Sequence, residues 1–300
     1  MEYIITGEDS VVAHWLRAGA DGFRLDVADE LPDDFIALLK KRLRQLKPDG
    51  LLLGEVWEDA SNKIAYDTRR RYFVDGELDS VMNYPFRKAI LDFVRREDDG
   101  RGLRETVLTL AENFPPDVLL CCMNLLGSHD TPRILTALVD GFDGTREENA
   151  RRHLSPEQYR KGRELLKMAS FLQFALPGAP SIYYGDEAGM EGAKDPFNRR
   201  AYPWGREDPD LLVHYRDLGR IRREQEALRL GDVRFSCAEG GRLGFCRSYG
   251  GIRLNICINR SDEPWAVAPG AVLLGYHLDT LSPNSLILSP GGMCVTREEI

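Results

Sequence analysis

The stretch DGFRLDVADE, residues 21–30, decides the fold, because it joins a short apolar-spaced strand to a dense group of charges. We expect the strand over residues 22–26. Side chains two positions apart on a strand point to the same face, so Arg24 and Asp26 should lie side by side. A guanidinium group beside a carboxylate keeps the carboxylate ionised, which is what a nucleophile requires. The acidic residues at the end of the stretch suit the positive end of a following helix.

Strands and helices alternate over most of the chain, with about 30 residues per strand–helix pair. Further strands are predicted at residues 51–55, 78–83, 118–127 and 179–187, and helices at about 9–18, 32–47, 85–96, 102–113, 156–176 and 209–228. Residues 188–208 are too rich in Gly, Pro and charge to form a regular element, so we expect a long ordered loop. The alternation indicates the α/β class, with a parallel sheet and helices outside it.

From residue 231 the pattern changes to short alternating runs, separated by the turn sequences GG, RSDEP and SPNS. Such runs predict β-hairpins. We therefore expect two domains, an α/β domain over residues 1–229 and a small all-β domain over residues 230–300.

The composition excludes several classes of protein. Forty Lys and Arg against 48 Asp and Glu give a net charge of −8, so no basic surface is available for nucleic acid. No apolar stretch approaches the length of a membrane span, so we expect no membrane partner and a cytoplasmic location. The six cysteines include the adjacent Cys121 and Cys122 and show no metal-type spacing, so reduced packing residues are expected.

The predicted strand ends carry an unusual set of polar residues, which are Arg24, Asp26, Glu55, Ser128, His129, Asp130, Asp186 and Glu187. In a parallel α/β fold such ends meet at one mouth. Asp26 and Glu55 lie 29 positions apart, one strand–helix repeat, so they should sit on neighbouring strands at the same height. Two facing carboxyl groups about 5 Å apart are what retaining glycoside hydrolysis requires. The apolar residues after Glu55 should hold its proton, as suits a general acid, and Asp130 adds a third carboxylate.

Each of these residues also has an ordinary structural interpretation. Asp26 alone could be a helix N-cap, and Glu55 alone a buried ion-pair partner of a neighbouring arginine. His129 alone could be a structural histidine, and Trp57 and the tyrosines of residues 182–187 could be core aromatics. The conjunction of several strand ends in one register favours the catalytic interpretation.

Three segments, GFRLDVADE (22–30), GEVW (54–57) and SHDTPR (128–133), resemble conserved regions of the α-amylase superfamily, glycoside hydrolase family thirteen. Two more, MNYPFR (82–87) and IYYGDEAGMEGAKDPFNRR (182–200), are similar to its neopullulanase, cyclomaltodextrinase and maltogenic amylase branch. The resemblance implies a (β/α)8 barrel, and retaining glycoside hydrolysis requires no cofactor; calcium dependence stays open.

The resemblance also implies a role for individual residues. Asp26 corresponds to the nucleophile, Glu55 to the acid/base and Asp130 to the stabiliser of the transition state. The implied sugar-binding residues are Arg24, His129, Asp195 and Arg199, with Glu30 and Trp57 on the acceptor side.

The chain departs from the family in one respect. A D-x-x-x-N-H-type motif on the third barrel strand should precede residue 9, and the first eight residues do not match it. Five strands are predicted where a closed barrel needs eight, so we expect a fragment: strands four to eight of the barrel, followed by a β-sandwich.

The resulting hypothesis is a retaining hydrolase of α-1,4-glucosidic bonds in cyclodextrins, pullulan, starch or maltooligosaccharides, with possible transglycosylation. The alternative is an inactive fragment that at most binds sugar. A non-catalytic transporter subunit is disfavoured, because the three carboxylates are present and no membrane span is predicted. The preferred glucan and the oligomeric state stay open.

Overall fold

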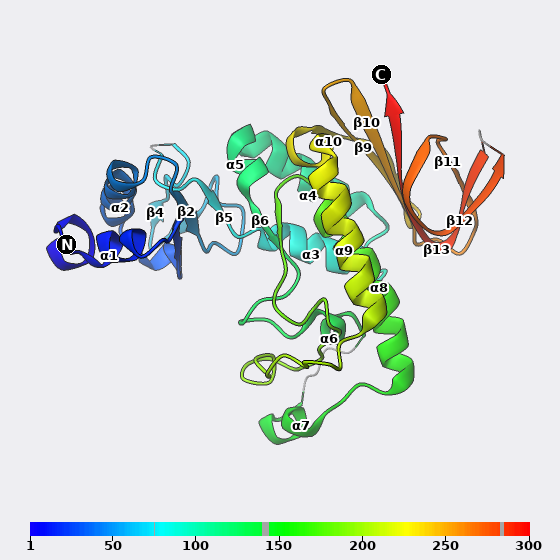
Figure 1. Ribbon diagram of the computed structural model, residues 1–300, viewed down its shortest axis with the longest axis horizontal. Coiled ribbons are helices and arrows are strands. Elements are labelled where there is room, and N and C mark those ends of the chain that lie inside the picture. The colour runs from blue at the N-terminus through cyan, green and yellow to red at the C-terminus, as the bar shows by residue number, and fades with distance from the viewer. Residues whose placement is uncertain (75, 140–143, 283–284) are drawn as a thin grey trace. The chain divides into compact units, whose positions relative to one another are not determined.

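The computed structural model describes residues 1–74, 76–139, 144–282 and 285–300, and Figure 1 labels their helices and strands. They form two compact units. Unit 1 comprises Met1–Pro85 and Leu108–Met123, and unit 2 comprises Phe86–Val107 and Asn124–Ile300.

Unit 1 contains a parallel three-stranded sheet in the order β1, β2, β5. Its strands are β1 (Gly22–Leu25), β2 (Leu51–Gly54) and β5 (Ser80–Val81). Leu25 pairs with Gly54, so the two residues that follow them leave the sheet at the same level. The other elements of unit 1 are the π-helix η1 (Glu2–Thr6), α1 (Val11–Arg17), the 3-10 helix η2 (Ala28–Glu30), α2 (Asp33–Leu46), β3 (Ile64–Ala65), β4 (Thr68–Arg69) and α5 (Pro116–Cys121).

The helices predicted at about residues 9–18 and 32–47 form as α1 and α2. Ser10 caps α1, since its Oγ accepts a hydrogen bond from the backbone N–H of Ala13 at 3.3 Å. Helix α2 buries Ile36, Leu39 and Leu43 at helical spacing, and acidic residues occupy its first turn. Both predictions are confirmed.

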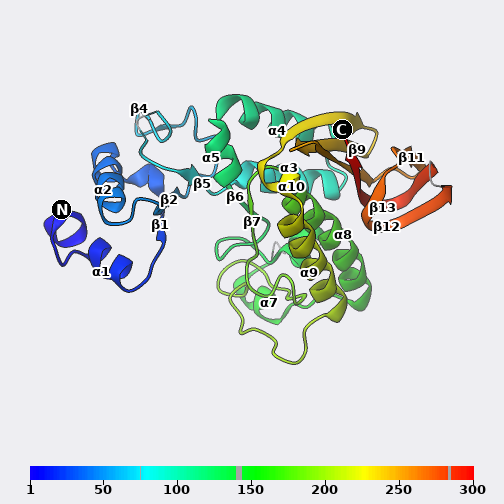
Figure 2. The same ribbon diagram turned by 45° about the horizontal axis from the view of Figure 1, so that its top comes forward.

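Unit 2 is built around a pair of long helices that lie side by side in Figures 1 and 2, α8 (Pro156–Ala175) and α9 (Pro209–Glu224). Ser155 and Gln158 form a capping box at the start of α8. Every residue of α8 from Leu165 to Ala175 is buried. The remaining helices with residues in unit 2 are α3 (Tyr84–Val94), α4 (Arg101–Asn113), α6 (Ile134–Val139), α7 (Arg146–Arg151) and α10 (Glu226–Leu230).

Three predicted strands are much shorter than expected: residues 78–83 form only the two-residue β5, and the other two lie at residues 118–127 and 179–187. The first half of residues 118–127 is helical, because α5 begins with Pro116 in its first turn, and the strand β6 covers only Met123–Leu125. Its partner β7 covers Ala179–Ser181. The following residues form turns instead of strand, with Gly185 at φ 88°. The helix predicted over residues 209–228 divides at Gln225, whose backbone is extended.

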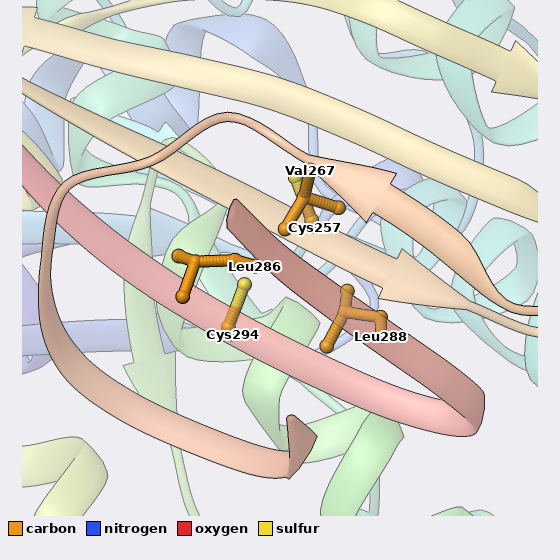
Figure 3. Packing of buried hydrophobic residues seen from close by; sticks show 5 residues of the cluster. All are labelled: Cys257, Val267, Leu286, Leu288 and Cys294. Atoms are coloured by element: carbon orange, nitrogen blue, oxygen red, sulfur yellow. The ribbon is translucent and has the colours of Figure 1, made fainter. Parts of the chain in front are cut away.

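An antiparallel sheet forms the last part of unit 2. Its strands are β8 (Asp232–Glu239), β9 (Arg242–Tyr249), β10 (Ile252–Asn259), β11 (Trp265–Val267), β12 (Ala271–Ser282) and β13 (Ser285–Glu299). The order is β11, β13, β10, β9, β8, and β12 also pairs with β13. Figure 3 shows one apolar cluster of this sheet, formed by Cys257, Val267, Leu286, Leu288 and Cys294.

The cysteines are all free thiols, but they are not all packing residues. Cys122 is buried, which raises the pKa of its thiol to about 11. Cys121 is exposed, so the expectation that both adjacent cysteines lie in the core is wrong for Cys121. Cys121 is the last residue of α5, and Cys122 is its C-cap with a non-helical backbone, so the two neighbouring side chains have different surroundings.

A buried polar cluster joins α8, α9 and β12. His214 is 1% exposed, and its Nε2 lies 2.9 Å from Ser170 Oγ and its Nδ1 2.8 Å from Tyr276 Oη. Burial, with a smaller effect of the nearby Lys167 charge, lowers the pKa of His214 to about 4. The imidazole is therefore neutral in the folded protein at neutral pH.

This histidine should make stability depend on pH. Between about pH 4 and 6.5 the unfolded state binds the proton that folded His214 rejects, so the free energy of unfolding should rise with pH. Relative to His214→Gln, the wild type should lose about 2 kcal/mol between pH 7 and pH 5. Urea unfolding of both proteins at the two pH values measures this difference. The exposed His14, replaced by Gln, is the control and should give no such difference.

No helix in the described ranges combines the length and the apolar character that crossing a lipid bilayer requires.

Candidate active site

The predicted site residues of unit 1 gather at the ends of β1 and β2. Arg24 contacts both carboxyl groups: its Nη1 lies 2.5 Å from Asp26 Oδ1, and its Nη2 lies 2.9 Å from Glu55 Oε2. The pairing of Leu25 with Gly54 places Asp26 and Glu55 at the next position on each chain. Asp26 and Glu55 therefore lie at the same height, as expected from the strand register. Arg24 and Asp26 lie side by side, as expected from strand alternation.

The two carboxyl groups have different surroundings. The Asp26 side chain is 71% exposed and that of Glu55 only 4%. Besides the arginine, Glu55 accepts hydrogen bonds from Val27 N at 2.8 Å and from Trp57 Nε1 at 3.3 Å. The expectation of an apolar setting is wrong, because Arg24, the backbone N–H of Val27 and the indole N–H of Trp57 all contact this carboxylate. Val27 adopts φ 41° to do so, a conformation that costs energy for a β-branched residue.

The acceptor-side candidates lie next to this pair in unit 1. Trp57 is 45% exposed and stacks on Tyr84, with ring centroids 3.8 Å apart and planes 10° from parallel. Glu30 accepts a hydrogen bond from the hydroxyl of Tyr66, which is 73% exposed. Trp57 is therefore not the core aromatic of the alternative interpretation. An accessible aromatic ring that stacks on a buried one beside polar groups is typical of sites that bind amphipathic ligands.

The N-cap interpretation of Asp26 is also wrong. The residue at the N-cap of the 3-10 helix η2 is Val27, and that of α2 is Pro32. The interpretation of Glu55 as a buried partner of an arginine agrees with its contact to Arg24, so burial and ion pairing alone do not separate the two roles.

The other site candidates lie in unit 2. The loop after β6 carries His129 and Asp130, with His129 Nε2 3.2 Å from Asp130 Oδ2 and both side chains partly exposed. Asn198 holds this loop from the segment 188–208: it is fully buried, and its Nδ2 donates to the carbonyls of His129 at 2.7 Å and Thr131 at 2.8 Å. The His129–Asp130 pair is thus fixed by a residue far along the chain.

Asp195 and Arg199 form an ion pair of 2.6 Å on the same long loop, and both side chains are about half exposed. Asp195 lines a hollow of about 380 Å³ together with Arg146, Asn149, Lys194, Pro196 and Phe197. Residues 188–208 contain no helix or strand, as expected for an ordered loop.

Asp186, expected at a strand end facing the mouth, is instead a core residue. It is 2% exposed and lies 3.3 Å from Nη1 of the fully buried Arg133. Burial raises the pKa of Asp186 to about 7, although the Arg133 charge opposes the rise. Gly127 allows this placement, because a Cβ at that position would lie 2.3 Å from Asp186 Oδ2.

Three residues that support the site were not predicted from the sequence: Tyr84, Arg133 and Asn198. Each lies inside a motif that was noticed, respectively MNYPFR, SHDTPR and DPFNRR. Arg133 packs its guanidinium over the rings of Tyr183 and Tyr184, 4.3 and 4.5 Å from their centroids. The motif membership was the available signal, but the contacts depend on the fold. In the part of the chain that the structure describes, no group of three His, Cys, Asp or Glu side chains could hold a metal ion.

Comparison with known proteins identifies the class. The family model of the alpha-amylase catalytic domain matches residues 4–227, so the chain belongs to the alpha-amylase family. This agrees with the resemblance of its strand-end motifs.

Individual relatives refine this class. The chain is 38% identical over 264 residues to an amylopullulanase of Thermoanaerobacter thermohydrosulfuricus, covering 82% of the chain and 17% of the relative. It is 35% identical over 259 residues to a cyclomaltodextrinase of Geobacillus thermopakistaniensis, covering 84% and 39%. The solved debranching enzyme of Nostoc punctiforme superposes with a TM-score of 0.77 at 26% identity, covering 95% of this chain and 59% of that one. The chain thus spans well under half of these two curated relatives. The name cyclomaltodextrinase is one of those expected for the branch, whereas the name amylopullulanase was not among them.

Proposed function

We propose that this chain carries the catalytic acids of a retaining α-glucan hydrolase that cleaves α-1,4-glucosidic bonds. The observation that carries the proposal is the contact of one arginine, Arg24, with both Asp26 and Glu55 at the ends of adjacent paired strands. A nucleophile and a proton donor on neighbouring strands suit the two-step chemistry of retention.

In the first step, a carboxylate oxygen of Asp26 attacks the anomeric carbon, and the bond from that carbon to the leaving oxygen breaks. Glu55 gives its proton to the leaving oxygen. In the second step, Glu55 takes a proton from water, and the water oxygen replaces Asp26 on the sugar; a second sugar hydroxyl in place of water gives transglycosylation. Oε2 of Glu55 contacts Nη2 of Arg24 and accepts a hydrogen bond from the backbone N–H of Val27. In this proposal Oε1, which accepts from Trp57 Nε1, is the oxygen that exchanges the proton.

The remaining candidates contribute sugar contacts in this proposal. Asp130 stabilises the positive charge that develops on the sugar ring, and His129 contacts the same sugar. The accessible pair Asp195–Arg199 binds sugar hydroxyls further along the glucan. The stacked rings of Trp57 and Tyr84 support the acceptor side. No cofactor is needed for this chemistry.

The proposal includes the domain organisation. We assign residues 1–229 to five consecutive strand–helix repeats of a (β/α)8 barrel and residues 230–300 to a β-sandwich. The parallel order β1, β2, β5 and the antiparallel strands that begin at Asp232 support this division. Cyclodextrins, pullulan, starch and maltooligosaccharides are the proposed substrates, in keeping with relatives named amylopullulanase and cyclomaltodextrinase.

The test is an assay of the chain, and in parallel of the complete gene product that contains it, on β-cyclodextrin, pullulan and soluble starch. We expect the folded gene product to release reducing ends from at least one of these, with the newly formed end in the α-configuration by NMR. Circular dichroism establishes folding in each sample. A folded gene product that hydrolyses none of the three substrates, or that releases the β-anomer, would contradict the proposal.

A further inference from the structure

A hollow in unit 2 carries an excess of positive charge. It has a volume of about 710 Å³ and lies between the first turn of α8 and the loop of residues 188–206. Three arginines line it, Arg160, Arg200 and Arg206. They come from segments up to 46 positions apart, so folding and not local sequence brings them together.

These arginines lack acidic partners. Among the residues that the structure describes, none of the three guanidinium groups forms an ion pair, whereas the adjacent Arg199 pairs with Asp195 and does not line this hollow. Unpaired arginines converging on one concavity are unexpected in a chain of net charge −8.

The acidic side chains near the hollow are already engaged. Glu191 lines it, but its carboxylate lies 2.5 Å from His153 Nδ1 and accepts from Leu154 N at 2.8 Å. Asp208 lies behind Tyr159 and accepts a hydrogen bond from its hydroxyl at 3.0 Å. The hollow is therefore left with a net positive charge.

The lining of the hollow is also closely packed and partly apolar. Tyr159, Met190 and Pro203 contribute to it. Gly189, at φ 78°, approaches Tyr159 so closely that a Cβ there would lie 2.2 Å from the tyrosine hydroxyl. Such a lining can contact the uncharged part of an anionic ligand, if that part is about the size of a sugar ring.

We propose that this hollow binds a phosphate monoester. A guanidinium group matches a phosphate with two parallel hydrogen bonds, and three such groups neutralise a dianion where a neutral sugar would leave their charges unused. The positive end of the 20-residue helix α8 adds to the attraction. The phosphate comes either on a sugar or as free inorganic phosphate. The inference does not rest on the proposed hydrolase function.

Isothermal titration of the protein with glucose 6-phosphate, inorganic phosphate and glucose tests the proposal. We expect glucose 6-phosphate to bind with a Kd of about 1 mM or tighter. The double variant Arg160→Gln/Arg206→Gln should bind it about 30-fold more weakly, because two charge-assisted contacts are lost. Added salt should weaken the binding. Arg223→Gln is the matched control, since this exposed arginine on α9 lies outside the hollow, and it should bind like the wild type.

The outcomes separate the sources of the phosphate. Tighter binding of glucose 6-phosphate than of inorganic phosphate supports the proposal and shows that the apolar part of the lining recognises the sugar body. Equal binding of the two supports it with free phosphate as the ligand. The proposal is overturned if neither anion binds, if glucose binds as well as its phosphate, or if the folded double variant keeps its affinity within about twofold.

Discussion

Replacement of Asp26 by Asn in the active gene product should lower kcat for glucan hydrolysis by about 10⁴-fold, because the amide cannot form the glycosyl ester. The exposed position of Asp26 beside Arg24 means that the change removes a nucleophile without opening a cavity. The loss should be the same for maltosyl fluoride as for a maltooligosaccharide, since both substrates need the nucleophile. Initial rates on the two substrates measure it.

The companion variant Glu55→Gln should behave differently on the same two substrates. Loss of the proton donor should lower kcat/KM, which reports the first step, by about 10²- to 10⁴-fold on the maltooligosaccharide and much less on maltosyl fluoride, because fluoride leaves without a full proton transfer. The split between substrates distinguishes a general acid from a residue that only positions Arg24, which would affect both equally.

Two matched carboxyl variants control for the change of charge. Asp21→Asn lies at the opposite end of β1, and Glu58→Gln is an exposed residue three positions after Glu55. Both should keep nearly the full rate. Near-normal hydrolysis by Asp26→Asn or by Glu55→Gln would contradict the assignment of roles.

The sequence was sufficient where local chemistry decides the structure. The 29-residue interval between Asp26 and Glu55 predicted their register, because one strand–helix repeat returns the chain to the neighbouring parallel strand. The helix predicted at about residues 9–18 forms as α1 and starts at Ser10, since the hydroxyl of Ser10 satisfies a backbone N–H that the helix leaves free. The GG sequences likewise predicted the β8–β9 and β9–β10 hairpins, whereas the hairpin predicted at RSDEP is wrong, because β10 and β11 do not pair with each other.

Other features depend on contacts between distant residues. The apolar run 118–127 fits a buried strand and a buried helix equally well. Its first half is helical, because Pro116 favours the start of a helix at that position. The backbone N–H of Val27 reaches Glu55 through a left-handed turn at Val27. A β-branched residue rarely adopts this conformation, so the sequence did not predict the turn. The stack of Trp57 on Tyr84 joins residues 27 positions apart. Sequence spacing therefore placed the two carboxylates and Arg24, but not the N–H donors of Glu55 or the stack of Trp57 on Tyr84.

The buried pair Arg133–Asp186 should contribute the largest effect on stability. Replacement of Arg133 by Met should lower the free energy of unfolding by about 3–5 kcal/mol at pH 7.5, because it leaves the 2%-exposed Asp186 carboxyl without its cation. The loss of contacts with Tyr183 and Tyr184 adds to it. Urea unfolding followed by circular dichroism measures the change.

The pH dependence of this deficit identifies its cause. The pKa of Asp186 is about 7 in the folded protein against 3.8 for an ordinary aspartate, so the folded state binds more protons in this range and its stability falls as pH rises toward 7. Without Arg133 the folded pKa should rise further, and the fall should continue above pH 7. The deficit of Arg133→Met should therefore grow between pH 7 and 9, by about 1.4 kcal/mol for each unit of added pKa shift. In the double variant with Asp186→Asn this growth should vanish. A deficit that is equal at pH 6 and pH 9 would mean that lost packing alone, and not the uncompensated carboxylate, destabilises the protein.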